Sequence, residues 1–511
     1  MTDYPADTIL DLFARAGDEQ PAIGAPGRVS LSYGDLRALA RRTIADLNRM
    51  GIGRNDRVAI VLPNGPEMAA AFVTIAAGAT TAPLNPAYRA EEFDFYLSDL
   101  NARALVIGQG MESPARAVAA ARGIPVIELV ADQAAPAGSF TLAPVAELTG
   151  ATRTPGVADG ADIALVLHTS GTTSRPKIVP LSHINITASA YHISETLRLA
   201  PDDCCLNIMP LFHIHGLIAA TLASLAAGAS VCCTPGFNAF RFFAWFAEVR
   251  PSWYTAVPTM HQAILGLAER NRMAIEAGRL RLIRSSSSPL PPQVMTALEE
   301  TFAVPVIEAY GMTEAAHQMA SNPLPPAPRY AGSVGIAAGP EIAIMDGEGK
   351  LLSPGELGEI VIRGRNVTAG YENNPKANAE AFIDGWFRTG DQGVMDEAGY
   401  LRLTGRLKEL INRGGEKVSP IEVDTVIMDH PAVVQCLTFA LPHAKLGEEV
   451  AAAIVLRDGM AASETELRDF AAKRLAPFKV PRKIVFLAEI PKGATGKLQR
   501  IGLAEKLGLS I

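Results

Sequence analysis

The stretch IALVLHTSGTTSRPK, residues 163–177, joins a short apolar run to a loop rich in hydroxyls and positive charge. The apolar part, 163–168, has the length and composition of a buried strand. The loop offers backbone N–H groups around Gly171, hydroxyl donors, and the cations Arg175 and Lys177, all of which suit a phosphate. A polar surface loop is the alternative, because Ser/Thr/Gly loops are common. The pattern predicts a strand that leads into a candidate phosphate loop.

Similar apolar runs alternate with helical stretches through the first part of the chain. The strand-like runs are VAIVL (58–62), ALVIG (104–108), PVIELV (125–130) and IALVLH (163–168). This alternation is typical of βαβ units built around parallel sheets. After about residue 330 the sequence changes to strands separated by glycine-containing turns, which predicts a compact antiparallel or barrel-like unit. The α/β class follows from this order of elements.

Composition favours a globular chain without a nucleic-acid partner. The 511 residues are 48% hydrophobic and 19% charged, with a formal net charge of -7. Enough apolar surface is present to offset ordering entropy, and no global basic field attracts nucleic acid. Five cysteines, an odd number with two adjacent pairs, fit reduced thiols better than a secreted disulfide framework. We expect a reducing compartment.

No membrane span or signal peptide is expected. Acidic residues stand where a signal peptide needs a basic segment, and residues 1–20 instead resemble a first amphipathic helix. The uncharged stretch from Gly216 to Cys233 imitates a span in length. Its leucines recur at helical spacing, Gly228 supplies a stop, and SVCCTP reads as a short strand. We predict a buried helix followed by a strand.

Several common motifs are absent. The sequence has no GxxxxGK[ST], no HExxH, no CxxC pair and no GxSxG, and GIGRND (51–56) lacks the third glycine of a dinucleotide fingerprint. These absences disfavour the Walker, Rossmann, zinc-site and serine-hydrolase interpretations.

A second candidate site is EAYGMTE, residues 308–314, which follows the apolar run PVI. It offers an aromatic face in Tyr310, a hydroxyl in Thr313 and a carboxylate in Glu314, which would suit a hydrated Mg²⁺. By itself the segment could equally be a strand-to-loop junction.

Three further segments complete a recognisable set. They are WFRTGD (386–391), GRLKELINRGGE (405–416) and PKGATGK (491–497). In order and approximate spacing, the five segments are similar to those of the acyl-CoA synthetases of the adenylate-forming (ANL) ligase superfamily. The resemblance implies ATP-dependent activation of a small-molecule carboxylate to an acyl-AMP, with release of pyrophosphate, followed by attack of coenzyme A.

The resemblance also implies an architecture. A large N-terminal adenylation domain, 1–405, would contain two βαβ-type subdomains and a barrel-like part at about 330–405. A small mobile α+β domain, 406–511, would swing between the two half-reactions about a hinge near Lys408. A hinge residue must absorb a large backbone change, which a solvated residue can do without disturbing a core.

Roles for individual residues are carried over from the same resemblance. The expected catalytic set is Lys497, Thr169, Glu314 and His213, with Glu314 as the Mg²⁺ ligand and Lys497 bridging carboxylate and phosphate. Tyr310 would stack on adenine, Asp391 would accept from the ribose hydroxyls, and Arg406 would lie beside it. The residues expected to bind ATP or CoA are Thr169, Ser170, Gly171, Thr172, Thr173, Lys177, Glu308, Ala309, Tyr310, Thr313, Asp391, Arg406, Lys497, Gly414 and Gly415.

The two glycines have a separate expected role. After the domain swing, Gly414 and Gly415 would approach the acyl-AMP beside the pantetheine channel, where only glycine permits close backbone contact. A tight surface turn is the alternative.

The expected acyl pocket is polar. In the relatives it is lined by the segments that here read LFHIHG (211–216), SSSSPL (285–290) and the run after YGMTE. A fatty-acid pocket would present mainly apolar side chains, whereas these segments present hydrogen-bond donors. The residues expected to bind substrate are His213, Ser286, Ser287 and His317, with His215 nearby. A short, polar, dicarboxylic substrate is expected.

The paired signatures SSSSPL and YGMTEAAHQMASNPLP resemble the oxalate–CoA ligases of plants and fungi. Alternatives are a malonate, coumarate-like or medium-chain acyl-CoA ligase, a stand-alone adenylation enzyme that loads a carrier protein, and a nucleotide sensor without catalysis. The chain ends LGLSI, without a peroxisomal tripeptide, so a cytoplasmic, bacterial enzyme is expected. The sequence leaves the oligomeric state open.

Overall fold

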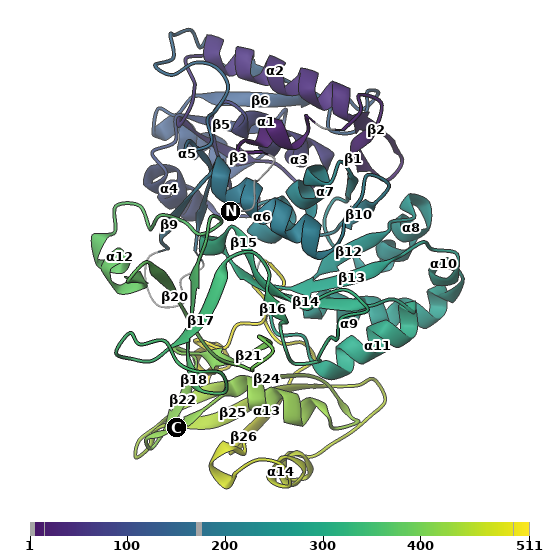
Figure 1. Ribbon diagram of the computed structural model, residues 1–511, viewed down its shortest axis with the longest axis vertical. Helices are drawn as coiled ribbons and strands as arrows, with labels where there is room; N and C mark the ends of the chain where they lie inside the picture. Colours follow the sequence, from purple (N-terminus) through teal and green to yellow (C-terminus); the bar gives the residue numbers. More distant parts are fainter. Residues whose placement is uncertain (1–5, 15, 170–175, 494, 510–511) are drawn as a thin grey trace.

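A seven-stranded sheet forms the first layer of the N-terminal part of the molecule (Figure 1). The computed structural model describes residues 6–14, 16–169, 176–493 and 495–509. The strand order is β7-β6-β5-β3-β4-β8-β9, parallel except for the antiparallel edge strands β7 and β9. The strands and the helices between them are β3 (Arg57–Val61), α3 (Pro66–Ala76), β4 (Thr80–Pro83), α4 (Ala90–Asp99), β5 (Ala104–Gly108), α5 (Pro114–Ala121), β6 (Val126–Ala131), β7 (Phe140–Pro144), β8 (Ile163–His168) and β9 (Ile178–Ser182).

A nine-stranded sheet forms the second layer, with the order β16-β15-β14-β13-β12-β10-β11-β1-β2. Its inner strands run parallel, and its outer strands pair antiparallel. The strands are β1 (Pro21–Ala25), β2 (Arg28–Ser32), β10 (Cys204–Asn207), β11 (Ser230–Cys233), β12 (Trp253–Ala256), β13 (Leu282–Ser286), β14 (Val306–Met312), β15 (His317–Ser321) and β16 (Ile336–Ala337).

Further helices and helical turns complete the N-terminal part: several lie beside β12, β13 and β14 in Figure 1, whereas α2 lies along β6 of the seven-stranded sheet. They are α1 (Ile9–Leu12), α2 (Tyr33–Arg49), α6 (His183–Thr196), η1 (His215–Leu222), α7 (Ala223–Ala226), α8 (Ala239–Val249), α9 (Pro258–Ala268), η2 (Glu269–Asn271), α10 (Arg272–Glu276), α11 (Pro292–Phe302) and η3 (Thr313–Ala315). Local caps explain where several begin. The Ser182 hydroxyl, for example, accepts from the backbone N–H of Asn185 at the start of α6.

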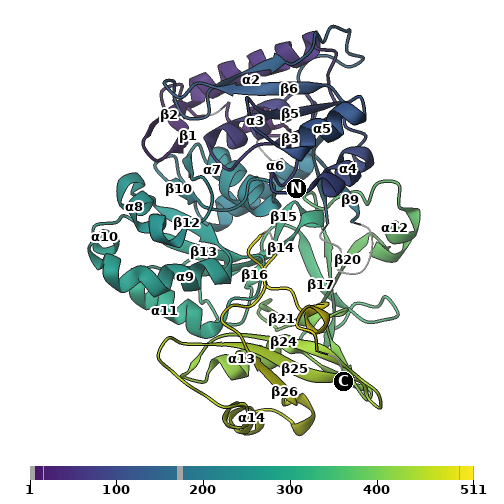
Figure 2. The same ribbon diagram turned by 180° about the vertical axis from the view of Figure 1, so that it is seen from behind.

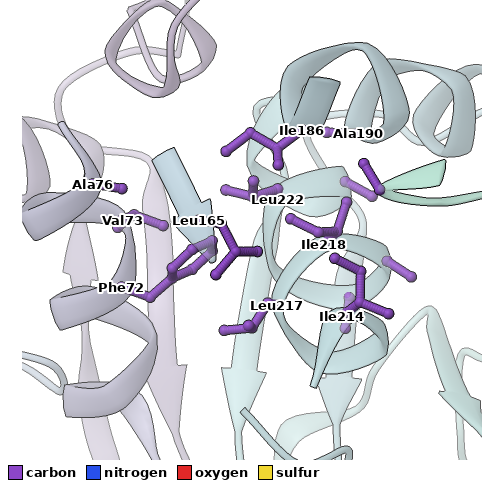
Figure 3. Close-up of a cluster of buried hydrophobic side chains, with 14 of the residues drawn as sticks. Phe72, Val73, Ala76, Leu165, Ile186, Ala190, Ile214, Leu217, Ile218 and Leu222 are labelled. Atoms are coloured by element: carbon purple, nitrogen blue, oxygen red, sulfur yellow. The ribbon is translucent and has the colours of Figure 1, made fainter. Parts of the chain in front are cut away.

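The core lies between the two large sheets (Figure 3). Phe72, on the fully buried helix α3, faces Leu165 of β8, and both face the apolar side of η1. Leu217 and Ile218 come from η1 and complete this cluster. Because the two sheets share one core, the loops at their carboxyl ends are held in a fixed relation.

A five-stranded antiparallel sheet follows. Its strands and one helix are β17 (Glu341–Met345), β18 (Leu357–Arg363), α12 (Pro375–Ala381), β19 (Phe382–Ile383), β20 (Trp386–Met395) and β21 (Leu401–Arg406). β21 pairs with β20 and ends at Arg406, where the chain passes into the C-terminal part.

The C-terminal part contains its own five-stranded sheet. Its elements are β22 (Ile411–Arg413), β23 (Glu416–Val418), α13 (Pro420–Met428), β24 (Val433–His443), β25 (Gly447–Leu456), α14 (Glu464–Ala472), η4 (Pro477–Lys479), β26 (Lys483–Phe486) and α15 (Leu503–Lys506). Figure 2 shows the yellow end of the chain rising from this sheet toward β14 and β16. The predicted α/β class, with a large N-terminal and a small C-terminal part, is confirmed.

Two local expectations need correction. The helix expected over residues 1–20 is only the short α1, Ile9–Leu12, within the described residues. The buried helix expected after Gly216 is first a π-helix, η1, and only then the short α7. The Thr221 hydroxyl donates to the carbonyl of Gly216 at 2.8 Å, five residues back, which suits this wider winding. None of the described helices is both long and apolar enough to cross a membrane.

Candidate active site

The candidate site lies where the parallel strands β13 and β14 end. In open α/β sheets, ligands bind outside the carboxyl ends of the strands. Ser287 follows β13 directly, and the helical turn η3 with Glu314 follows β14. β8 ends at His168, just before the predicted phosphate loop. Three of the sequence-predicted segments therefore lie at the carboxyl ends of their strands.

The described ends of the phosphate loop are joined to each other. The backbone N–H of Thr169 donates to the carbonyl of Lys177 at 3.0 Å, and the N–H of Lys177 faces the Thr169 hydroxyl at 3.3 Å. The loop is therefore the connection of the β8–β9 hairpin. The predicted residues Ser170, Gly171, Thr172 and Thr173 lie outside the described residues.

Glu314 is held by a tyrosine that the motif analysis missed. The Tyr371 hydroxyl donates to Glu314 Oε1 at 2.7 Å, and Lys177 Nζ lies 3.9 Å from the centroid of the Tyr371 ring. Burial lowers the pKa of Lys177, while the Glu314 carboxylate opposes that shift. A carboxylate and a cation thus flank one aromatic ring beside the phosphate loop. The AGY triplet at 369–371 is the only sequence signal for this tyrosine.

Glu314 fits a Mg²⁺ that is held mainly by the phosphates of the nucleotide. The described residues contain no group of three His, Cys, Asp or Glu side chains placed to hold a metal. Glu314 is 6% exposed, and Thr313 precedes it in η3. Mg²⁺ usually keeps several waters and binds through one or two carboxylates plus substrate phosphates, so a lone Glu314 fits it.

Asp391 joins two of the predicted nucleotide-binding residues. The Tyr310 hydroxyl donates to Asp391 Oδ2 at 2.6 Å, and Arg406 Nε donates to Asp391 Oδ1 at 2.9 Å. Asp391 and Arg406 face each other across the β20–β21 pair. The structure therefore places Arg406 beside Asp391, and it fixes the orientation of the Tyr310 ring.

Glu308 and Ala309, both in β14, accept hydrogen bonds from β13 and from the segment that follows it. Glu308 Oε1 accepts from the backbone N–H of Leu290 at 2.8 Å, and burial raises the pKa of Glu308 to about 8. The carbonyl of Ala309 accepts from the Ser286 hydroxyl at 2.9 Å. Ser286, a predicted substrate ligand, therefore already donates its proton inside the protein.

His215 links two elements of the predicted acyl pocket. Its Nε2 lies 2.6 Å from the Thr255 hydroxyl, and its Nδ1 lies 3.0 Å from the Ser287 hydroxyl. The His215 and His317 rings stand 5.0 Å apart between centroids. The His215 backbone N–H faces His213 Nδ1 at 3.4 Å. The histidines and Ser287, far apart in sequence, form one polar cluster.

Two residues of this cluster have unusual backbone conformations. Ser287 has φ 78° and His317 has φ 106°, a region that favours glycine. Each such residue costs of order 1–3 kcal/mol, and such residues concentrate at functional sites. These two φ values agree with the predicted role of Ser287 and His317 in the acyl site.

The histidines are neutral at physiological pH. Burial lowers the pKa of His213 to about 3, and Lys497 adds to the effect. Burial, aided by neighbouring cations, also holds the pKa of His215 and His317 well below the usual range. Each neutral imidazole can donate one hydrogen bond and accept another.

Lys497 reaches the site from the C-terminal part. The Thr259 hydroxyl donates to the carbonyl of Gly496 at 2.8 Å, and Gly496 has φ 81°. Burial lowers the pKa of Lys497 to about 8; Arg406 contributes, and Asp391 opposes the shift. Lys497 is thus close to both the nucleotide residues and the acyl cluster.

Gly414 and Gly415 are exposed at the turn between β22 and β23. Their φ values of 60° and 98° match a tight hairpin turn. Their expected approach to the acyl-AMP belongs to the second half-reaction and stays a prediction.

Comparison with known proteins agrees with this geometry. Residues 11–372 match the model of the AMP-binding enzyme family, and residues 422–497 match the AMP-binding enzyme C-terminal domain. The oxalate–CoA ligase of Arabidopsis thaliana is 44% identical over 502 residues, covering 96% of this chain and 96% of that protein. The oxalate–CoA ligase of Saccharomyces cerevisiae is 42% identical over 480 residues, covering 89% and 88%.

Solved structures are similar over the whole chain. ATP-bound MatB from Rhodopseudomonas palustris is 30% identical and superposes with a TM-score of 0.87, covering 98% of each chain. The apo crystal structure of the same protein gives a lower TM-score of 0.78. With both family models matched in order over most of its length, the chain belongs to the AMP-binding enzyme family, as one of its acyl-CoA synthetases.

Proposed function

We propose that the chain is an oxalate–CoA ligase that works through an acyl-adenylate. One carboxylate oxygen of oxalate attacks the α-phosphorus of ATP, a new P–O bond forms, and pyrophosphate leaves. The CoA thiolate then attacks the activated carbonyl carbon, a thioester forms, and AMP leaves. The observation that supports oxalate most strongly is the cluster of neutral histidines and Ser287 in place of an apolar acyl pocket.

The nucleotide residues have separable roles in this proposal. Thr169 and Thr313 contact phosphate oxygens, and Glu314, oriented by Tyr371, helps hold Mg²⁺. Bound Mg²⁺ would neutralise part of the triphosphate charge. Tyr310 stacks on adenine, and Asp391 accepts from ribose hydroxyls while Tyr310 and Arg406 keep its carboxylate oriented.

The domain arrangement supports the adenylation step. We propose a domain of residues 406–511 that turns about Lys408 relative to 1–405. The Thr259–Gly496 hydrogen bond and the higher similarity to ATP-bound than to apo MatB support an adenylation-competent orientation. In it, Lys497 bridges the attacking carboxylate and the α-phosphate.

The pKa of Lys497 predicts a pH dependence of adenylation. A lysine with a pKa of about 8 is charged below that pH and neutral above it. We expect kcat/KM for adenylation to fall about tenfold per pH unit above this value, because kcat/KM reports the free enzyme. A pyrophosphate-release assay from pH 6.5 to 9.5 measures it. A flat profile up to pH 9.5 would contradict the bridging role.

A pyrophosphate-release screen tests the proposed substrate. Oxalate, malonate, acetate, coumarate and hexanoate are supplied separately, with and without CoA. We expect oxalate to give the highest kcat/KM and to yield oxalyl-CoA only when CoA is present. Turnover of hexanoate without detectable oxalate activity would reject the proposal.

Substitutions in the acyl cluster provide a second test. Ser287→Ala and His317→Ala should each lower kcat/KM for oxalate at least about tenfold, or about 1.4 kcal/mol, since the distal carboxylate loses a donor. The KM for ATP should change little. Ser288→Ala is the neighbouring control, because the Ser288 hydroxyl donates to the carbonyl of Ser287 and not to the histidines. Equal losses in all three variants would show that the loop, and not its donors, matters.

We also propose a cytoplasmic location. Cys204, Cys205, Cys232, Cys233 and Cys436 are all free thiols, as a reducing compartment allows.

A further inference from the structure

Arg284 is a fully buried arginine in β13, three residues before Ser287. Its Nη2 donates to Gln318 Oε1 at 3.2 Å. Its Nε and Nη1 are buried and have no hydrogen-bond partner among the described residues. Burial lowers the pKa of Arg284 to about 9, so the guanidinium still carries its charge at neutral pH.

A guanidinium buried this deeply in a protein normally has a carboxylate partner. Arg281, in the segment leading into the same strand, shows the usual arrangement, with its Nη2 2.9 Å from Asp203 Oδ2. No ion pair to Arg284 occurs within the described part of the chain. An unpaired buried charge is strongly unfavourable, so a folded protein retains it only where something offsets that cost.

The surroundings of Arg284 connect it to the acyl cluster. Thr255, its partner in the β12–β13 register, holds His215 Nε2, and His215 in turn contacts Ser287. The charge of Arg284 adds to burial in lowering the pKa of both His215 and His317. Arg284 is therefore close enough to both histidines to act on them electrostatically.

Gln318 fixes the guanidinium in that place. The Gln318 side-chain amide donates to the Thr196 hydroxyl and to the carbonyl of Ala338, both at 3.1 Å. These two bonds turn the amide oxygen of Gln318 toward Arg284. Gln318 directly follows His317, so the same strand holds the cation and one pocket histidine.

We propose that Arg284 is the fixed positive charge that selects a substrate with a second carboxylate. This inference rests on the proposed oxalate–CoA ligase activity and deepens it. One carboxylate of oxalate loses its charge when the acyl-AMP forms, but the other stays anionic throughout. The neutral histidines supply hydrogen bonds to that carboxylate, and the nearby Arg284 supplies the compensating charge. Arg284 is thus a positioning and specificity residue that acts through the histidines.

Removal of the charge should change substrate preference. In Arg284→Met we expect kcat/KM for oxalate to fall at least about 30-fold, while kcat/KM for acetate, which has no second carboxylate, changes less than about threefold. The Tm should stay equal or rise, because an apolar side chain replaces an unpaired buried charge. Arg284→Lys should retain most of the preference for oxalate.

A second variant neutralises the charge without removing it. Gln318→Glu places a carboxylate against Arg284 and should lower the oxalate-to-acetate ratio in the same direction. This variant remains informative if Arg284→Met fails to fold. Arg281→Gln is the matched control, and its oxalate-to-acetate ratio should equal that of the wild type.

The outcomes separate this inference from the proposed function. If the wild type does not use oxalate, the proposed function fails. If the wild type uses oxalate but Arg284→Met and Gln318→Glu keep the wild-type ratio, the role of Arg284 is overturned and the function stands. Equal losses for oxalate and acetate would assign Arg284 a purely structural role and would also overturn the inference.

Discussion

Lys497→Ala is expected to abolish most acyl-AMP formation while leaving thioester formation from supplied acyl-AMP nearly intact. Lys497 approaches the site beside His213 and Arg406, where its charge can bridge the attacking carboxylate and the α-phosphate. Loss of one preorganised donor of this kind costs about 10²–10³-fold in rate. In the second half-reaction the domain of residues 406–511 is expected to have turned about Lys408 and to have carried Lys497 away from the phosphate, so that step should not need this lysine.

The two half-reactions must be measured separately. Pyrophosphate release reports adenylation, and oxalyl-CoA formation from synthetic oxalyl-AMP reports thioesterification. Lys492→Ala is the matched control, because Lys492 lies in the same segment but is exposed and paired with Glu489. Equal losses in both half-reactions would refute the assignment of Lys497 to adenylation.

Lys408→Pro is expected to impair one half-reaction far more than the other. Lys408 follows β21, and the backbone hydrogen bonds described around it are donated by Leu407, Glu409 and Leu410. Proline fixes φ near -65°, and an incompatible conformation costs about 3 kcal/mol. That cost corresponds to roughly a 100-fold loss in the step that needs the other domain orientation.

The control for the hinge is Lys408→Ala, which removes the charge but leaves the backbone free. We expect it to retain both half-reactions within about threefold, since a hinge depends on backbone rotation. The same pair of assays used for Lys497 measures both variants. A Lys408→Pro enzyme with both half-reactions unchanged would show that the chain turns elsewhere.

The sequence alone predicted much of the fold, because hydrophobic patterning acts locally. The runs 104–108 and 163–168 are the strands β5 and β8 with the predicted bounds. A short apolar run between turns has few ways to bury itself other than as an inner strand of a parallel sheet. The winding of η1 could not be predicted in this way, because it depends on Asn207 and Thr221 meeting the carbonyl of Gly216 in the folded protein.

In the site, too, some features follow from the sequence and others only from the folded structure. The motifs predict that Arg406 lies beside Asp391. In the structure Arg406 Nε lies 2.9 Å from Asp391 Oδ1. The sequence by itself determined which chemical groups the site can use, namely hydroxyls, a carboxylate, histidines and a lysine at recognisable spacings. Only tertiary structure decided that Arg284 is buried with no counter-ion among the described residues and that Tyr371 orients Glu314. The physical reason is that burial and charge pairing depend on what packs around a residue, and strands distant in the chain supply those neighbours.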